Sequence, residues 1–164
     1  MKLRKDRTSQ EIIVLLHNIR SAHNVGSIFR TSDAVGVNRI VLSGYSPAPR
    51  DEYKRVRRDI AKVALGAEHS VPWEKVENLG KYLSVLREHG FRVVAVEQSR
   101  QAVDYSIVRS SKKMAFIFGN EVEGLPRDIL AVADVVAEIP MKGKKESLNV
   151  SVAAGIALFR ILGR

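Results

Sequence analysis

The sequence contains no cysteine, which excludes disulfide bonds and every metal site built on thiolates. It also lacks a long apolar segment: the longest uncharged stretch, residues 147–159, falls well short of the about 20 residues that span a bilayer. The basic N-terminus, MKLRKDR, is followed by an apolar run too short for a signal peptide. We therefore expect a soluble, cytoplasmic protein.

Several familiar site motifs are missing as well. There is no G-x-G-x-x-G for a dinucleotide and no G-x-S-x-G for a serine hydrolase. Gly119 and Gly124 have the spacing of a P-loop, but Leu125 and Pro126 stand where Lys and Ser or Thr are required. The four histidines have no spacing typical of metal ligands, so we expect no metal.

The charge balance, in contrast, is uneven. Lys and Arg outnumber Asp and Glu by 27 to 18 in a chain of 164 residues, which gives a net charge of +9. Such an excess favours anionic partners, with nucleic acid first among them. The alternative is a basic surface with no specific partner. The length and the apolar fraction of 45% fit a single globular domain.

Short apolar runs alternate with helical patterns along the chain. Strands are predicted at residues 12–16, 39–42, 69–71, 91–96, 115–118 and 135–139, and helices at residues 25–35, 53–65, 76–89, 126–133 and 148–162. This alternation predicts an α/β fold with a mainly parallel sheet flanked by helices. Ligands of such sheets bind beyond the carboxyl ends of the strands, and three of these ends carry unusual residues.

The first unusual strand end is followed by NVGSIFRTSDAVG. Asn24 is a candidate N-cap, and Gly26 would let a ligand approach the start of the helix. Asn24, Ser27 and Arg30 recur every three residues, so they form one row on the helix that could hold a phosphate or a ribose. The alternative is a structural N-cap with an Arg30–Asp33 ion pair.

The second and third strand ends carry GNEVEGLP and IPMKGKKESLN. In the second, the glycines suit a turn close to a flat ligand, and Glu121 and Glu123 could accept hydrogen bonds; the alternative is a solvated turn. In the third, Ser147 and Asn149 precede a helix that is apolar or small nearly all round, which predicts burial in a core or an interface. The alternative there is capping alone, with Ser147 as the N-cap.

Together, NVGSIFRTSDAVGV, FIFGNEVEGLP and IPMKGKKESLNVSVAAGIALF resemble the three motifs of the SpoU/TrmH family of SPOUT methyltransferases. The resemblance extends from about residue 15 to residue 162, with the motifs in order. It implies an RNA ribose 2′-O-methyltransferase that uses S-adenosylmethionine (SAM). It also implies a deep C-terminal trefoil knot and a site built across a homodimer.

Carried over by position, the resemblance also implies roles for individual residues. Those implied to contact SAM, largely through backbone groups, are Gly119, Ile139, Met141, Leu148 and Asn149. Those implied for catalysis and substrate positioning are Asn24, Arg30, Glu121, Ser147 and Asn149.

Several relatives carry an N-terminal RNA-binding domain or a long helical extension that this sequence lacks. We therefore expect residues 1–164 to form one methyltransferase domain without a separate RNA-binding domain. Its own basic side chains would then hold the RNA; the candidates are Arg50, Lys54, Arg55, Arg57, Arg58, Lys62, Lys142, Lys144 and Lys145. The alternative interpretation of these residues is a solvated basic surface.

The implied reaction is attack of a ribose 2′-oxygen on the methyl group of a sulfonium. Because that methyl is already activated, the protein must position the reactants and help the hydroxyl lose its proton. A guanidinium stays protonated, so we favour Arg30 as a phosphate ligand that stabilises the developing alkoxide. The family proposal that this Arg is the general base stays open. Two alternatives also remain, a wobble-nucleotide tRNA methyltransferase of the same superfamily and an RNA-binding protein that has lost catalysis.

Overall fold

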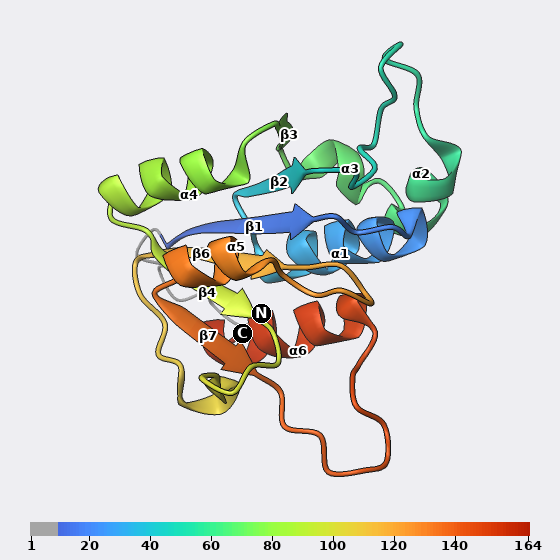
Figure 1. Cartoon of the computed structure of the whole chain (residues 1–164). Helices are drawn as coiled ribbons and strands as arrows, with labels where there is room; N and C mark the ends of the chain where they lie inside the picture. Colours follow the sequence, from blue (N-terminus) through green and yellow to red (C-terminus); the bar gives the residue numbers. More distant parts are fainter. Residues whose placement is uncertain (1–9) are drawn as a thin grey trace, which may run out of the picture.

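Buried runs of β-branched and aromatic residues form a seven-stranded sheet between helices in the computed structural model, which describes residues 10–164 (Figure 1). The elements in chain order are β1 (Glu11–His17), α1 (Ala22–Val35), β2 (Arg39–Ser43), α2 (Arg58–Ala64), α3 (Ala67–Ser70), β3 (Trp73–Val76), α4 (Leu79–Glu88), β4 (Arg92–Val96), β5 (Val103–Asp104), the 3-10 helix η1 (Tyr105–Ile107), β6 (Lys113–Phe118), α5 (Arg127–Val132), β7 (Val135–Glu138) and α6 (Val150–Leu162).

The strand order is β3-β2-β1-β6-β4-β7-β5, and every strand pairing within the described residues is parallel. The expected α/β fold with a parallel sheet is therefore confirmed. Because all strands run the same way, their carboxyl ends meet at one edge, where ligands of such sheets bind. No helix in the described part of the chain is long and apolar enough to cross a membrane.

Both faces of the sheet are covered, as the apolar character of its strands predicts. Alternate residues of β1 separate two cores: Ile12, Val14 and Leu16 pack with α1 and α6, whereas Ile13 and Leu15 pack with α4 and α5. The helices thus take up the two faces of the sheet and leave the edge with the carboxyl ends for the connecting loops.

Gly26 serves packing in the structure and not the close approach of a ligand that we expected. It is buried on α1, and a Cβ atom added there would lie 2.7 Å from the backbone oxygen of Ile60 and 3.0 Å from Cβ of Val63. Helix α2 therefore packs directly on the backbone of α1 at this position.

Two expected helix caps are wrong by a few residues. Helix α1 begins after Ser21, whose Oγ accepts a hydrogen bond from the backbone N–H of Asn24 at 3.2 Å. Helix α6 begins after Asn149, whose Oδ1 accepts from the backbone N–H of Ser151 at 2.9 Å, so Ser147 is not its cap. The side chain of Asn24 is thereby released for another contact.

Two predicted elements also differ. Residues 67–70 form the short helix α3, so the strand predicted at 69–71 is wrong. The strand that follows is β3, which includes Val76, so the helix predicted at 76–89 begins later, as α4. The helix predicted at residues 53–65 is shorter in the structure, where only α2 (Arg58–Ala64) is helical. The reason is Asp51, whose Oδ1 accepts from the backbone N–H groups of Tyr53 and Arg55, both at 2.9 Å, and so holds that segment as a loop.

Candidate active site

Hydrogen bonds join the three motif segments at the carboxyl edge of the sheet. The side-chain amide of Asn24, on α1, donates to Oε1 of Glu121, after β6, at 2.9 Å. The amide of Asn149, the cap of α6, donates to Oδ1 of Asn24 at 3.1 Å. Asn24 is buried, so this chain of amides and carboxylate forms a fixed polar seam through the three segments.

Glu121 also accepts from backbone N–H groups, that of Arg20 at 3.1 Å and that of Ser21 at 3.3 Å. Burial alone raises the pKa of Glu121, but the hydrogen bonds from Asn24 and from these two N–H groups outweigh it. The pKa of Glu121 therefore lies below its ordinary value of 4.5. The carboxylate is ionised at neutral pH and locks the start of α1 to the loop after β6.

A pocket opens beside this seam, with about 620 Å³ of empty space that includes open solvent. We call it the strand-end pocket; it is lined by Val96, Glu97, Gln98, Phe118, Gly119, Asn120, Glu121, Glu138, Ile139, Met141, Ser147, Leu148, Val150 and Ala153. Apolar side chains and three carboxylates share its wall. The pocket thus suits a ligand that combines apolar parts with hydrogen-bond donors or a positive charge.

The structure brings together most of the residues singled out from the sequence. Of the implied SAM contacts, Gly119, Ile139, Met141 and Leu148 line the strand-end pocket, and so do Glu121 and Ser147 of the catalytic set. Asn24 and Asn149 lie outside the lining but join it through the hydrogen bonds to Glu121 described above. Arg30 is the one member of the set that neither lines the pocket nor joins the seam.

Arg30 is exposed on α1, six residues and therefore about 9 Å along the helix axis from Asn24. Within residues 10–164 it forms no ion pair, and Asp33, the partner that a structural role would give it, instead accepts a hydrogen bond from Oγ of Ser70 at 2.6 Å. The alternative of an Arg30–Asp33 ion pair is therefore wrong, and the guanidinium is left available to a ligand or to a second chain.

Glu97, after β4, was missed from the sequence. Its Oε2 accepts from the backbone N–H of Leu125 at 2.9 Å, and its Oε1 accepts from that of Gln98 at 2.9 Å. Gly119 also fixes this loop, because a Cβ added there would lie 2.7 Å from Cγ of Leu125. The sequence could have predicted Glu97, because a fourth apolar strand, β4, is followed by the polar residues EQS. In a parallel sheet these residues must lie at the same edge as the other three strand ends.

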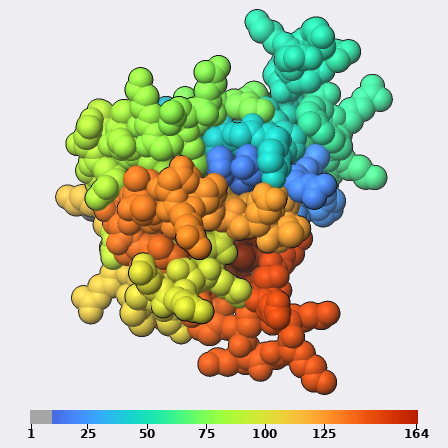
Figure 2. Space-filling model, viewed as in Figure 1, coloured from blue at the N-terminus to red at the C-terminus, as the bar shows by residue number. Residues whose placement is uncertain are grey.

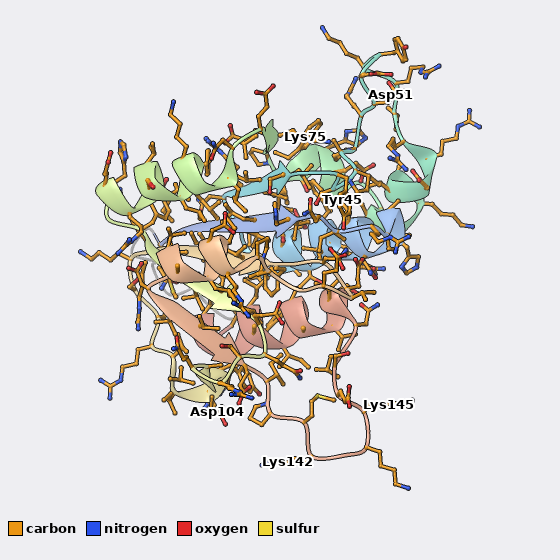
Figure 3. The ribbon with its side chains drawn as sticks, viewed as in Figure 1. Tyr45, Asp51, Lys75, Asp104, Lys142 and Lys145 are labelled. Carbon is orange, nitrogen blue, oxygen red and sulfur yellow. The ribbon has the colours of Figure 1, made fainter. Side chains whose placement is uncertain are left out.

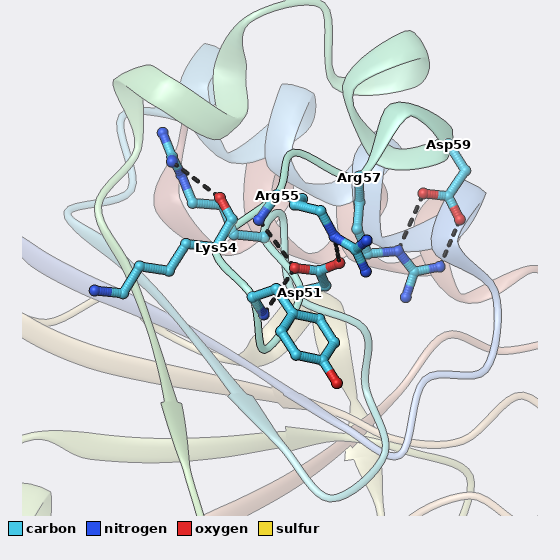
Figure 4. A network of polar contacts seen from close by, with 7 residues as sticks. Asp51, Lys54, Arg55, Arg57 and Asp59 are labelled. Atoms are coloured by element: carbon cyan, nitrogen blue, oxygen red, sulfur yellow. Dashed lines mark hydrogen bonds and ion pairs between the residues drawn. The ribbon is translucent and has the colours of Figure 1, made fainter.

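The predicted RNA-binding residues gather on two projections. The first, which we call the basic arm (residues 50–57), stands clear of the body before α2 (Figure 1), and Figure 4 shows its polar contacts from close by. In it Arg55 pairs with Asp51 at 2.7 Å and Arg57 with Asp59 at 2.5 Å, and the Arg55 guanidinium lies 4.9 Å from the ring centroid of Tyr53. Arg50 and Lys54 and, on α2, Arg58 and Lys62 are exposed and have no ion pair among the described residues.

The second projection is the lysine loop (residues 141–146), which connects β7 to α6 and exposes Lys142, Lys144 and Lys145. In Figure 3 the side chain of Tyr45 lies between the basic arm, marked by Asp51, and the lysine loop, marked by Lys142 and Lys145. The two basic projections thus stand on either side of the carboxyl edge of the sheet.

Comparison with known proteins agrees with this geometry. The sequence model of the SpoU rRNA methylase family matches residues 11–159. A protein of Staphylococcus haemolyticus named as a TrmH family tRNA/rRNA methyltransferase is 33% identical over 157 residues, which are 96% of this chain and 60% of that protein. The chain thus spans about 60% of the length of that relative.

Two solved structures share the fold. An AdoMet-bound rRNA methyltransferase from Sinorhizobium meliloti superposes with a TM-score of 0.83 at 32% identity, over 92% of this chain and 55% of that one. A TrmH/SpoU tRNA modifying enzyme of A. aeolicus gives a TM-score of 0.81 at 32% identity, over 93% of this chain and 74% of that one.

Proposed function

The chain belongs to the SpoU rRNA methylase family, and from this premise we propose that it transfers a methyl group from SAM to a ribose 2′-hydroxyl of tRNA or rRNA. The observation that carries the proposal is the seam from Glu121 through Asn24 to Asn149 at the wall of the strand-end pocket. Three segments far apart in the sequence supply it, and they are the three segments on which the resemblance depends.

The strand-end pocket fits SAM. Val96, Ile139 and Leu148 offer apolar contacts, while Glu97 and Glu138 add negative charge to the wall, which favours a cationic ligand with amino and hydroxyl groups. Gly119, Ile139, Met141 and Leu148 would hold it, with Asn149 at the start of α6. When bound, SAM supplies a methyl group activated by its sulfonium.

The residues of this chain then position the acceptor and stabilise charge. Glu121 is held by three donors, so it fixes the start of α1 and with it the row that carries Arg30. Arg30 holds an RNA phosphate and stabilises the negative charge that develops on the 2′-oxygen, while the proton leaves through phosphate or water. Ser147, exposed at the pocket wall, is free to contact the substrate.

We propose further that the chain acts as a homodimer through α6. One face of this helix is buried, with Ala154, Ala157 and Leu158 at 0% exposure, but Val152 is 48% and Phe159 40% exposed. The helix packs on α1 at the residue that follows Arg30, since a Cβ added at Gly155 would lie 3.8 Å from Cγ2 of Thr31. A site completed by a second copy accounts for the position of Arg30 outside the pocket of its own chain.

A methyl-transfer assay with labelled SAM and separate tRNA and rRNA pools tests the proposal. We expect label in one pool and, after mapping, at one ribose 2′-position. Label at a tRNA wobble nucleotide would assign the chain to the wobble methyltransferases. RNA binding without label in either pool would instead favour a binding protein that has lost catalysis, and would overturn the proposed activity.

A further inference from the structure

A second hollow lies next to the strand-end pocket and has no part in the mechanism above. We call it the Tyr45 hollow; it has about 830 Å³ of empty space that includes open solvent, and it is lined by Arg20, Tyr45, Asn120, Val122 and Glu123. These residues come from the loops after β1, β2 and β6, whose surfaces adjoin in the space-filling view (Figure 2). Asn120 lines both hollows, so the two ligand spaces are neighbours.

Tyr45 is an exposed aromatic residue held in one position. Its side chain is half exposed, yet its hydroxyl oxygen accepts a hydrogen bond from Nδ2 of Asn120 at 2.7 Å. Its backbone N–H donates to Oδ1 of Asn18 at 3.2 Å. A ring that is fixed before a ligand arrives loses little entropy on binding, which is useful in a recognition surface.

The backbone that holds Tyr45 in this position contains two residues with a positive φ. Asn18 has a positive φ of 55°, and Gly44 has a φ of 60°. A Cβ added at Gly44 would lie 1.8 Å from Oδ1 of Asn18, so only glycine lets that amide reach the backbone of Tyr45. Glycine adopts a positive φ freely, but at the non-glycine residue Asn18 such a conformation is unfavourable, and conformations of this kind gather at functional sites, where the surrounding structure holds them.

The groups around the ring match the needs of an unpaired nucleobase. Arg20 is exposed and forms no ion pair within residues 10–164, and Val122 is 82% exposed, so a free guanidinium side chain and an apolar side chain line the hollow together with Tyr45. Splayed bases stack on such groups. The Tyr45 hydroxyl, which accepts from Asn120, keeps its own proton for a base carbonyl, and Glu123 can accept from a base N–H group. A phosphate fits less well, because Glu123 would repel it.

The position of the hollow indicates which base it takes. Asn120 is the wall between the two hollows, and Glu121 and Val122 continue that wall on opposite sides. Because the two hollows share Asn120, a nucleotide whose ribose lies at the strand-end pocket is close enough to place its base in the Tyr45 hollow. We propose that the Tyr45 hollow binds the unpaired base of the nucleotide that is methylated, which makes the substrate a loop or another single-stranded segment. This inference rests on the proposed function.

Steady-state kinetics of Tyr45→Ala and Tyr45→Phe, on the RNA that the wild type methylates, test the inference. Tyr45→Ala removes the base stacking on the aromatic ring, so it should lower kcat/KM about 5-fold to 150-fold. Tyr45→Phe removes the hydroxyl, and with it the hydrogen bond from Asn120 and a donor to the base, but keeps the ring, so its loss should be clearly smaller than that of Tyr45→Ala. Both variants should bind SAM as the wild type does, measured by calorimetry. Arg20→Ala, at an exposed position, provides a second test if Tyr45→Ala does not fold.

The outcomes separate the inference from the proposed function. Methylation by Tyr45→Ala at the wild-type kcat/KM would overturn the inference and leave the function standing. An equal loss in Tyr45→Phe and Tyr45→Ala would also overturn it, because Tyr45 would then act only as an anchor for Asn120. A wild-type protein that methylates no RNA would overturn the proposed function, and the inference with it.

Discussion

At the scale of single residues, the ionised carboxylate of Glu121 does most to hold the candidate site together. Three donors converge on it, two from the backbone ahead of α1 and one from the side chain of Asn24. Asn24 in turn accepts from Asn149, so the charge of Glu121 orients amides that lie beyond its own reach. Loss of that charge should therefore affect stability as well as activity.

We predict that Glu121→Gln removes a pH-dependent part of the stability. Burial alone raises the pKa of Glu121 and the hydrogen bonds lower it further than burial raises it, so the folded-state pKa lies below 4.5. A carboxyl group with a lowered pKa stabilises the fold above its unfolded-state pKa, and this contribution disappears as the pH falls through the folded-state value. The wild type should thus melt above Glu121→Gln at pH 7, and the gap should close below pH 4.5. A gap that does not change with pH would contradict this account.

We predict that Arg30→Ala separates SAM binding from methyl transfer. Arg30 is exposed and does not line the strand-end pocket, so its loss should alter neither the fold nor SAM affinity. The loss should fall on the transition state, where removal of one such group commonly lowers the rate about 10²- to 10³-fold. Calorimetry with SAM and single-turnover methylation measure the two effects on one sample. A wild-type rate would make Arg30 structural, and a loss of SAM binding would place the methyl donor elsewhere.

At the scale of elements, the basic arm and α2 form one candidate RNA-binding surface, but their charges are not equally available. Arg55 is paired with Asp51 and Arg57 with Asp59 (Figure 4). Arg58 and Lys62, in contrast, are exposed on α2 without an ion pair among the described residues. The unpaired cations are the better candidates for phosphate contacts, because a contact there does not require an existing ion pair to break.

We predict that the double variant Arg58→Glu and Lys62→Glu makes RNA binding less dependent on salt. Each lost phosphate contact removes about one released counterion, so the slope of log affinity against log salt should become shallower by roughly 1 to 2. Arg109→Glu with Lys112→Glu is the matched control, because both residues are exposed and precede β6, at the opposite edge of the sheet. Equal slopes for the double variant and the wild type would place the RNA surface elsewhere.

The helices and strands also show which parts of the fold the sequence predicts. Uninterrupted apolar runs such as residues 115–118 identify the central strands. Three polar strand ends identify most of the pocket, because a parallel sheet brings its carboxyl ends together. Short elements cannot be predicted in this way: β5 has only two residues, too few to show a periodic pattern. Local side-chain bonds also overrule propensity, as when Asp51 holds residues 53–57 out of a helix. The deep knot implied by the resemblance stays a prediction.

At the scale of the whole molecule, the exposed apolar side chains of α6, Val152 and Phe159, support the proposed homodimer. We predict that the protein sediments at micromolar concentration as a dimer, with about twice the chain mass of 18.2 kDa. Val152→Glu should shift it toward the monomer, because it places a charge in the apolar contact. Val85→Glu on α4, at a valine 42% exposed against 48% for Val152, is the control and should remain a dimer. A wild type that sediments as a monomer would exclude the dimer and, with it, a site shared between two copies.

The polar seam has a consequence for how the protein folds. Its hydrogen bonds join residues 97 and 125 positions apart in the sequence, within a sheet whose neighbours are all parallel and therefore distant along the chain. Such non-local contacts form late and slowly, because a long loop must close before any of them can form. During synthesis the seam cannot close until α6 has been made and has packed. Recovery of SAM binding in a refolding experiment should accordingly lag behind the recovery of helix content, so the methyl donor is itself a probe for the last step of folding.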